Sequence, residues 1–272
     1  MTQNAQTYGG SWADEYDEIF PPGPAADQAA NWLADLFADL VGPDARAGAA
    51  ALELAVGTGR VAIPLAERGI RVHGIDLEPS MIEVLHRKTP PPTLTAAVGD
   101  MTDAATFTAP DGIQHYQLVY CVFNSLYALP DGAAQRRALA AAATVLAPGG
   151  RLVLEMAMPD VTGFDAQGRR IRHLSAPGEG AWLETSRHDP LAQTITSDIV
   201  LWGEAGPRTQ PVYARYVWPS ELDLMAELAG LGLVHRQSGW DGAPFTAGPG
   251  IYVSVYEPAR QPTTISSTPT VS

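Results

Sequence analysis

A glycine-rich turn follows a short apolar run at Glu53-Leu-Ala-Val-Gly57-Thr-Gly59-Arg60. Glycines at such a strand-to-helix turn let the backbone approach a ligand closely and direct N–H groups toward it. Asp76 ends the next apolar run, 19 residues after Gly57, at the spacing where an acid accepts hydrogen bonds from ribose hydroxyls. This pattern predicts a nucleoside-binding site.

A second acidic position sharpens this prediction. Asp100 and Met101 follow the third apolar run, where a carboxylate can accept from an adenine amino group and a thioether can pack on the ring. Glu53 would repel the pyrophosphate of a dinucleotide if it faced the ligand, whereas it suits a cationic nucleoside such as S-adenosylmethionine. The third position of the dinucleotide fingerprint is Ala62, which that fingerprint also allows, so both ligand classes stay open.

Alternating strands and helices from about residue 50 must position these residues. The apolar runs predict core strands, and helical patterns lie between them. Two further strands are expected late in the chain, which makes about seven in all. An α/β fold with a doubly wound, mainly parallel sheet follows, and ligands bind at the carboxyl ends of such strands. The expected strands are Ala51–Val56, Arg71–Ile75, Leu94–Val98, Leu118–Phe123, Arg151–Ala157, Leu233–Gln237 and Ile251–Tyr256.

The alternation stops after the fifth strand. Three β-rich stretches without helices, Ala181–Arg187, Gln193–Trp202 and Pro211–Trp218, predict an antiparallel insertion. Ser220-x-x-Asp223 then resembles a capping box and predicts a helix to about Leu231.

These patterns divide the chain into segments. We expect an N-terminal helical segment that covers the cofactor site, an α/β core that binds the cofactor, the antiparallel insertion, and a C-terminal helix with the closing strands. A tail rich in Thr, Ser and Pro is expected to be disordered. The segments are 1–47, 48–158, 159–218, 219–258 and 259–272.

Composition excludes several classes of function. The 272 residues carry a formal net charge of −13, which disfavours nucleic acid and anionic membranes as partners. The one cysteine, Cys121, cannot form a disulfide framework or a cysteine-based zinc site, and we expect no metal. The first twenty residues lack the features of a signal peptide, and no run of 18 apolar residues occurs, so we expect a cytoplasmic protein.

Five motifs, in order, resemble the class I S-adenosylmethionine-dependent methyltransferases. The motifs are ELAVGTGR, GIDLEPSMIEVL, VGDM, QLVYCVFNSLYAL and LAPGGRLVLEM, and the resemblance runs from about Tyr8 to Tyr256. The N-terminal Tyr8-Gly-Gly…Ala13-x-x-Tyr16-Asp17 and the insertion are similar to an actinobacterial small-molecule subgroup, which includes sugar and glycopeptide N-methyltransferases. A Rossmann-like methyltransferase sheet and S-adenosyl-L-methionine as cofactor are what the resemblance implies.

The resemblance also implies roles for individual residues. Tyr16 would hydrogen-bond the methionine carboxylate, Asp76 would hold the ribose hydroxyls, and Asp100 would bind adenine. The remaining expected cofactor contacts are Glu53, Ala55, Gly57, Gly59, Leu77, Met81, Met101, Cys121 and Val122.

The expected chemistry is methylation of a nitrogen or oxygen on a small molecule. Asn124 and Tyr127, after the fourth strand, could orient the acceptor, and proximity would dominate catalysis. The sugar N-methyltransferases carry a His in this stretch, where this chain has Ala128, so no general base is evident. The alternatives are an NAD(P)-dependent oxidoreductase, a non-catalytic nucleoside-binding protein, and transfer of the aminocarboxypropyl group.

Overall fold

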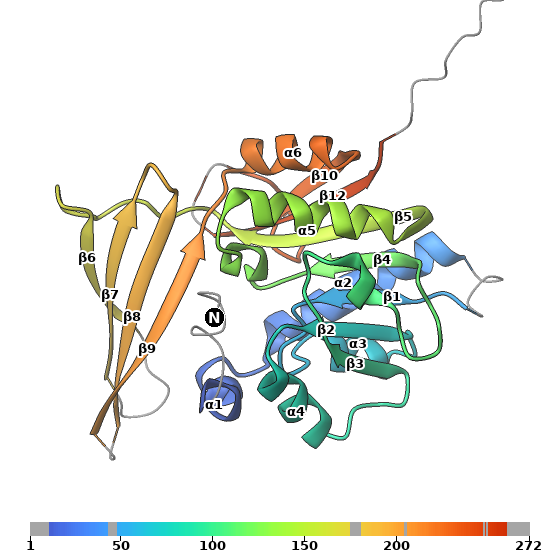
Figure 1. Cartoon of the computed structure of the whole chain (residues 1–272), viewed down its shortest axis with the longest axis horizontal. Coiled ribbons are helices and arrows are strands. Elements are labelled where there is room, and N and C mark those ends of the chain that lie inside the picture. The colour runs from blue at the N-terminus through green and yellow to red at the C-terminus, as the bar shows by residue number, and fades with distance from the viewer. Residues whose placement is uncertain are drawn as a thin grey trace, which may run out of the picture.

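The computed structural model describes residues 11–42, 48–174, 181–203, 206–246, 248 and 250–259. Its main element is an eight-stranded sheet with the order β11-β10-β12-β5-β4-β1-β2-β3 (Figure 1). The strands are β1 (Ala51–Leu54), β2 (Val72–Asp76), β3 (Leu94–Val98), β4 (Tyr116–Cys121), β5 (Leu146–Ala157), β10 (Leu231–Ser238), β11 (Ala243–Pro244) and β12 (Ile251–Pro258).

Strands β3, β2, β1, β4 and β5 run parallel, and β12 pairs antiparallel with both β5 and β10. All four residues of β1 are buried, as are five of the six in β4, because helices cover both faces of the sheet. The seven predicted strands are present, and the two-residue β11 is the eighth. The predicted doubly wound α/β fold is therefore confirmed.

Helices pack on both faces of this sheet. The helices α2 (Pro24–Val41), α3 (Ala62–Glu67) and α4 (Pro79–Arg87) bury side chains such as Leu33 and Leu65 against one face. The helices α5 (Gly132–Thr144) and α6 (Pro219–Leu228) bury Leu139 and Leu222 against the other. No helix in the described part of the chain is long and apolar enough to cross a membrane.

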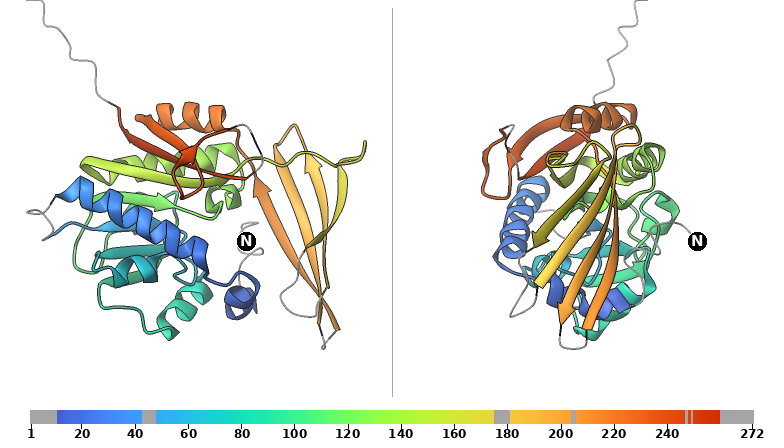
Figure 2. Two further views of the ribbon diagram at one scale, coloured as in Figure 1. Left: turned by 180° about the vertical axis from the view of Figure 1, so that it is seen from behind. Right: turned by 90° about the vertical axis from the view of Figure 1, so that its left-hand side faces the viewer.

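The insertion after β5 forms a separate antiparallel sheet that stands beside the carboxyl ends of the parallel strands (Figure 2). It has four strands, one more than predicted. The missed strand is β6, whose sequence RRIRHL lacks an apolar alternation because most of its side chains are exposed. The strands are β6 (Arg169–Leu174), β7 (Ala181–Asp189), β8 (Thr194–Gly203) and β9 (Gly206–Arg215).

The predicted capping box is contradicted, and two predicted terminal features lie almost wholly outside the described residues. The capping box at Ser220 is wrong: α6 begins at Pro219, its N-cap Trp218 has no side-chain capping bond, and Asp223 instead accepts from Arg236 and Tyr256. The predicted tail lies outside the described residues except for Ala259, and so does Tyr8 of the N-terminal motif.

Candidate active site

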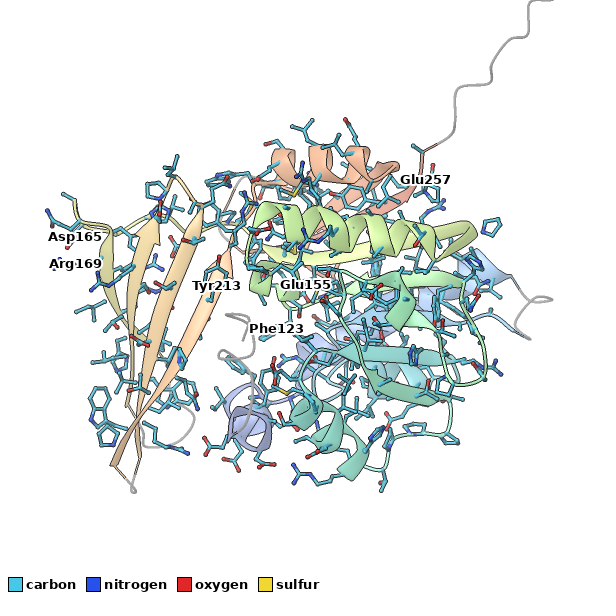
Figure 3. All side chains as sticks on the ribbon, viewed as in Figure 1. Phe123, Glu155, Asp165, Arg169, Tyr213 and Glu257 are labelled. Carbon is cyan, nitrogen blue, oxygen red and sulfur yellow. The ribbon has the colours of Figure 1, made fainter. Side chains whose placement is uncertain are left out.

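A cavity of about 530 Å³ opens at the carboxyl ends of the parallel strands. Loops after β1 to β5 form its floor, α1 (Ser11–Ile19) lies over one side, and the insertion sheet forms the opposite wall. Figure 3 labels Phe123, which follows β4, and Tyr213, on β9, on the two sides of this space. Ten predicted site residues line the cavity: Tyr16, Ala55, Gly57, Asp76, Leu77, Met81, Asp100, Met101, Asn124 and Tyr127.

A hydrogen bond from the backbone of the glycine turn to the side chain of Asp76 joins the two. The N–H of Gly57 donates to Asp76 Oδ2 at 2.8 Å, and the N–H of Glu78 donates to Oδ1 at 2.9 Å. The carboxylate has further lone-pair capacity for a ligand. Burial raises the pKa of Asp76, although the backbone donors favour its charged form.

The two glycines of the turn are needed for different reasons. Both have positive φ, 54° at Gly57 and 86° at Gly59. A Cβ at Gly59 would lie 2.9 Å from the Ile63 side chain, so Gly59 permits close packing of the turn on α3. A Cβ at Gly57 would meet nothing within 4 Å, because this residue faces the open cavity.

The loop after β3 offers a carboxylate in a part of the cavity that is also lined by apolar side chains. Asp100 Oδ1 accepts from the N–H of Thr102 at 2.8 Å, and no described residue donates to Oδ2. Met81, Met101 and Leu77 also line the cavity. A flat ring with an exocyclic amino group fits such a set, since the sulfurs can contact its face and the acid its edge.

Three aromatic rings form a row along the cavity. The ring of Phe20 lies 5.2 Å from Tyr16 and 5.7 Å from Phe123. The Arg60 guanidinium is 4.5 Å from the Phe123 ring, and its Nη1 donates to the carbonyl of Phe20 at 2.9 Å. We did not predict Phe20 or Phe123 from the sequence; the signal for Phe123 was its position directly after a buried strand.

Backbone strain is concentrated at the same place. Ala55, Phe123 and Asn124 have positive φ values of 58°, 55° and 62°, which L-residues rarely adopt. All three line the cavity, where such strain is typical of functional sites.

Polar contacts of two acidic residues, Asp17 and Glu15, hold α1 over the cavity. Asp17 accepts from Thr58 Oγ1 at 2.7 Å and pairs with Lys88 Nζ at 2.5 Å. Lys88 is the only lysine of the chain, and its Nζ also donates to the Thr58 carbonyl. Glu15, on the same helix, pairs with Arg208 of the insertion sheet. The helix that carries Tyr16 is thereby tied to the glycine turn and to the opposite wall.

Four predicted contact residues, Glu53, Gly59, Cys121 and Val122, are not among those that line the cavity. Glu53 accepts from the Tyr120 hydroxyl at 3.0 Å, and burial raises its pKa to about 8. A neutral, buried carboxyl cannot attract a cationic ligand at pH 7. Cys121 is also buried, which raises the pKa of its thiol to about 12. Alternation along β1 turns Glu53 to the sheet face covered by α2 and α3.

Asn124 and Tyr127 reach the cavity, and one polar side-chain atom of each bonds to the same residue, Ala157. Asn124 Oδ1 accepts from the backbone N–H of Ala157, and the Tyr127 hydroxyl donates to the Ala157 carbonyl at 2.7 Å. The same hydroxyl lies 3.2 Å from the Val217 carbonyl. Burial raises the pKa of Tyr127 far above its usual value, so its hydroxyl keeps its proton. These contacts favour a positioning role over contact with the acceptor.

Known proteins identify the class to which this fold and cavity belong. Residues 51–150 match a family described as a methyltransferase domain. The CcbJ methyltransferase from Streptomyces caelestis has 33% sequence identity, with 95% of this chain and 98% of that chain covered and a TM-score of 0.80. This chain belongs to the S-adenosylmethionine-dependent methyltransferases, and the oxidoreductase and non-catalytic alternatives are not retained.

Among individual relatives, the chain is 27% identical to a cypemycin N-terminal methyltransferase from a Streptomyces species over 202 residues, which cover 74% of this chain and 79% of that protein. The fold is shared with CalS10, an amino pentose methyltransferase from Micromonospora echinaspora whose structure holds S-adenosylmethionine. CalS10 has 24% identity and a TM-score of 0.64, with 88% of this chain and 95% of that chain covered.

The residues of the cavity fit this cofactor. Asp76 offers lone pairs beside an accessible glycine backbone, and Asp100 Oδ2 lacks a described donor. The row of aromatic rings suits a cation, because ring faces attract positive charge. Four carboxylates but one guanidinium line the described cavity: Asp76, Glu78, Asp100 and Glu184 against Arg172.

Proposed function

We propose that this methyltransferase methylates an amine nitrogen of a small molecule that binds between α1, the strand ends and the insertion sheet. The excess of carboxylates over guanidinium groups along the cavity carries this proposal, because it favours cationic groups such as ammonium ions. The similarity to an enzyme that methylates an N-terminus supports a nitrogen acceptor.

The donor half of the cavity would be formed by the loops after β1, β2 and β3. Asp76 would accept from the ribose hydroxyls, Asp100 would accept from the adenine amino group, and Met101 would pack on the ring. Tyr16 would contact the methionine portion from α1. When bound, S-adenosylmethionine supplies a methyl group made electrophilic by its positively charged sulfur.

The chain itself contributes position and exclusion of water. Holding a nucleophile close to an electrophile lowers the barrier without any further chemical group. An alcohol acceptor would also need a strong base. No His lines the described cavity, its carboxylates are weak bases toward an alcohol, and Asn124 and Tyr127 are committed to Ala157. An amine needs only to lose a proton to water before it attacks, which favours nitrogen over oxygen.

A small molecule is also the acceptor class that suits the charge of the chain. A formal net charge of −13 would repel the phosphates of nucleic acids. We propose the cytoplasm as the compartment, because the donor is made there.

Calorimetry followed by an acceptor screen tests this function. Purified protein is titrated with S-adenosylmethionine, S-adenosylhomocysteine and NAD, and only the first two are expected to bind. The protein and labelled donor are then incubated with amines, phenols and alcohols, and the masses of the products are measured by mass spectrometry. A gain of one methyl group on amines supports the proposal. Methylation of phenols alone, or a gain of the aminocarboxypropyl group, contradicts it.

A further inference from the structure

An arginine–glutamate pair forms part of the cavity wall opposite the strand ends. Arg172 on β6 lies directly across from Glu184 on β7 in the insertion sheet. The Arg172 Nε and Nη2 atoms both donate to Glu184 Oε2, at 2.8 and 2.6 Å, and both side chains line the cavity. The proposed function counts their charges but assigns neither residue a contact with the donor or the acceptor.

The two oxygens of Glu184 differ in what they bind. Oε2 takes both hydrogen bonds from Arg172, and no described residue donates to Oε1. The Glu184 side chain is 13% exposed, while that of Arg172 is 43% exposed. Because both bonds from Arg172 end on Oε2, Oε1 is the oxygen that Glu184 can offer as an acceptor in the cavity wall.

Arg172 is already bonded to carboxylates of the protein itself. Its Nη1 donates to Asp160 Oδ2 at 3.0 Å, so two carboxylates already surround it. A hydrogen bond from Thr162, together with the positive charges of Arg170 and Arg172, lowers the pKa of Asp160 and keeps this acid ionised. Asp160 and Glu184 are balanced by Arg170 and Arg172 in this cluster, because Arg170 Nη1 also pairs with Asp160 Oδ2 at 2.9 Å. Arg172 is also the one cation among the described residues that line the cavity.

We propose that Glu184 binds the methyl acceptor through Oε1 and selects amines that carry no free carboxylate. An ammonium or neutral N–H would donate to Oε1, whereas a carboxylate would meet the four carboxylates of the cavity lining and a guanidinium that already binds two acids. Amides, esters and uncharged substituents beside the amine are compatible with this wall. This inference rests on the proposed function and specifies the substrate class for the same cavity.

The test compares paired acceptors that differ only in one group. A panel of amino acid amides and the matching free amino acids is offered with labelled donor to the wild-type enzyme and to Glu184→Gln. The control is Asp198→Asn, which removes the same charge from β8. Asp198 is exposed and neighbours Ile199, the residue opposite Glu184, so it lies on the other face of the sheet.

We expect the wild-type enzyme to prefer the amide by at least about tenfold in kcat/KM. Glu184→Gln should lower kcat/KM for the amide by about 10- to 100-fold, mainly through KM, and should narrow the preference for the amide over the acid. Asp198→Asn should change neither quantity. The affinity for S-adenosylhomocysteine, measured by calorimetry, should be the same in all three proteins.

Two results overturn the inference. They are a wild-type preference for the free acid and an unchanged amide-to-acid ratio in Glu184→Gln. Failure of the donor to bind, or methylation of no amine although the donor binds, would instead contradict the proposed function, so the two failures are distinguished.

Discussion

Thr58 Oγ1 donates a hydrogen bond of 2.7 Å to Asp17 Oδ1 and thereby joins α1 to the glycine turn. Thr58 stands between the two glycines and is fully buried, whereas Asp17 lies one residue after Tyr16. The only lysine of the chain, Lys88, bonds to both partners. The residues that we expect to hold the donor and the helix that lies over the cavity therefore form one hydrogen-bonded unit.

Removing this connection should weaken donor binding. Asp17→Asn loses the ion pair with Lys88, and we expect the Kd for S-adenosylmethionine to rise about tenfold because Tyr16 is less well positioned. Calorimetry measures this Kd. Asp14→Asn is the control, since its pair with Arg87 lies on the exposed surface of the same helix and contributes little. Equal affinities in the two variants would show that α1 does not depend on Asp17.

Asp76→Asn should weaken donor binding more strongly. The amide offers one acceptor oxygen where the carboxylate serves both Gly57 and Glu78, so its NH2 group would face a backbone N–H. We expect the Kd to rise about 100-fold. Asp103→Asn is the matched control, because Asp103 also accepts from a backbone N–H after a strand but does not line the cavity. A loss of affinity in both variants would point to general damage.

The buried carboxyl of Glu53 should make stability depend on pH. Its pKa is raised to about 8 in the folded protein, against 4.5 when exposed, so the folded state holds a proton that the unfolded state releases in this range. Stability should therefore fall as pH rises from about 4.5 to 8 and then level off. Glu53→Gln keeps an acceptor for Tyr120 and removes this cost.

Thermal unfolding at pH 5 and pH 8.5 measures the effect. The Tm of Glu53→Gln minus the Tm of the wild-type protein should be higher at pH 8.5 than at pH 5. Glu83→Gln, an exposed change on α4, should show no such trend. A constant difference for Glu53→Gln would mean that the carboxyl is already ionised in the folded protein at pH 5.

Tyr127→Phe should lower stability without changing how turnover depends on pH. The lost hydroxyl leaves the carbonyls of Ala157 and Val217 without this donor, at a cost of about 1–3 kcal/mol. Tyr116→Phe is the control, because the Tyr116 hydroxyl donates to the buried Phe107 carbonyl away from the cavity. Both should lower Tm. A changed pH profile, or a far larger loss of turnover in Tyr127→Phe at native Tm, would show instead that its hydroxyl takes part in the reaction.

Much of the sheet and of the donor site could be predicted because the signals are local. The β3 strand matches its predicted bounds of Leu94–Val98, and Asp76 and Asp100 line the cavity at the ends of their strands. A parallel sheet brings its carboxyl ends to one edge, so residues distant in sequence become neighbours once the strands are recognised.

The sequence by itself determined the order of strands and helices from β1 to β5, the position of the glycine turn, and the acids that follow the strands, because alternation and turn chemistry act over a few residues. Only the tertiary structure decided which way Glu53 points, that Asn124 and Tyr127 both bind Ala157, and that Arg172 and Glu184 face the same cavity. Such pairings depend on burial and on contacts between segments far apart in the chain, and no short pattern of residues encodes them.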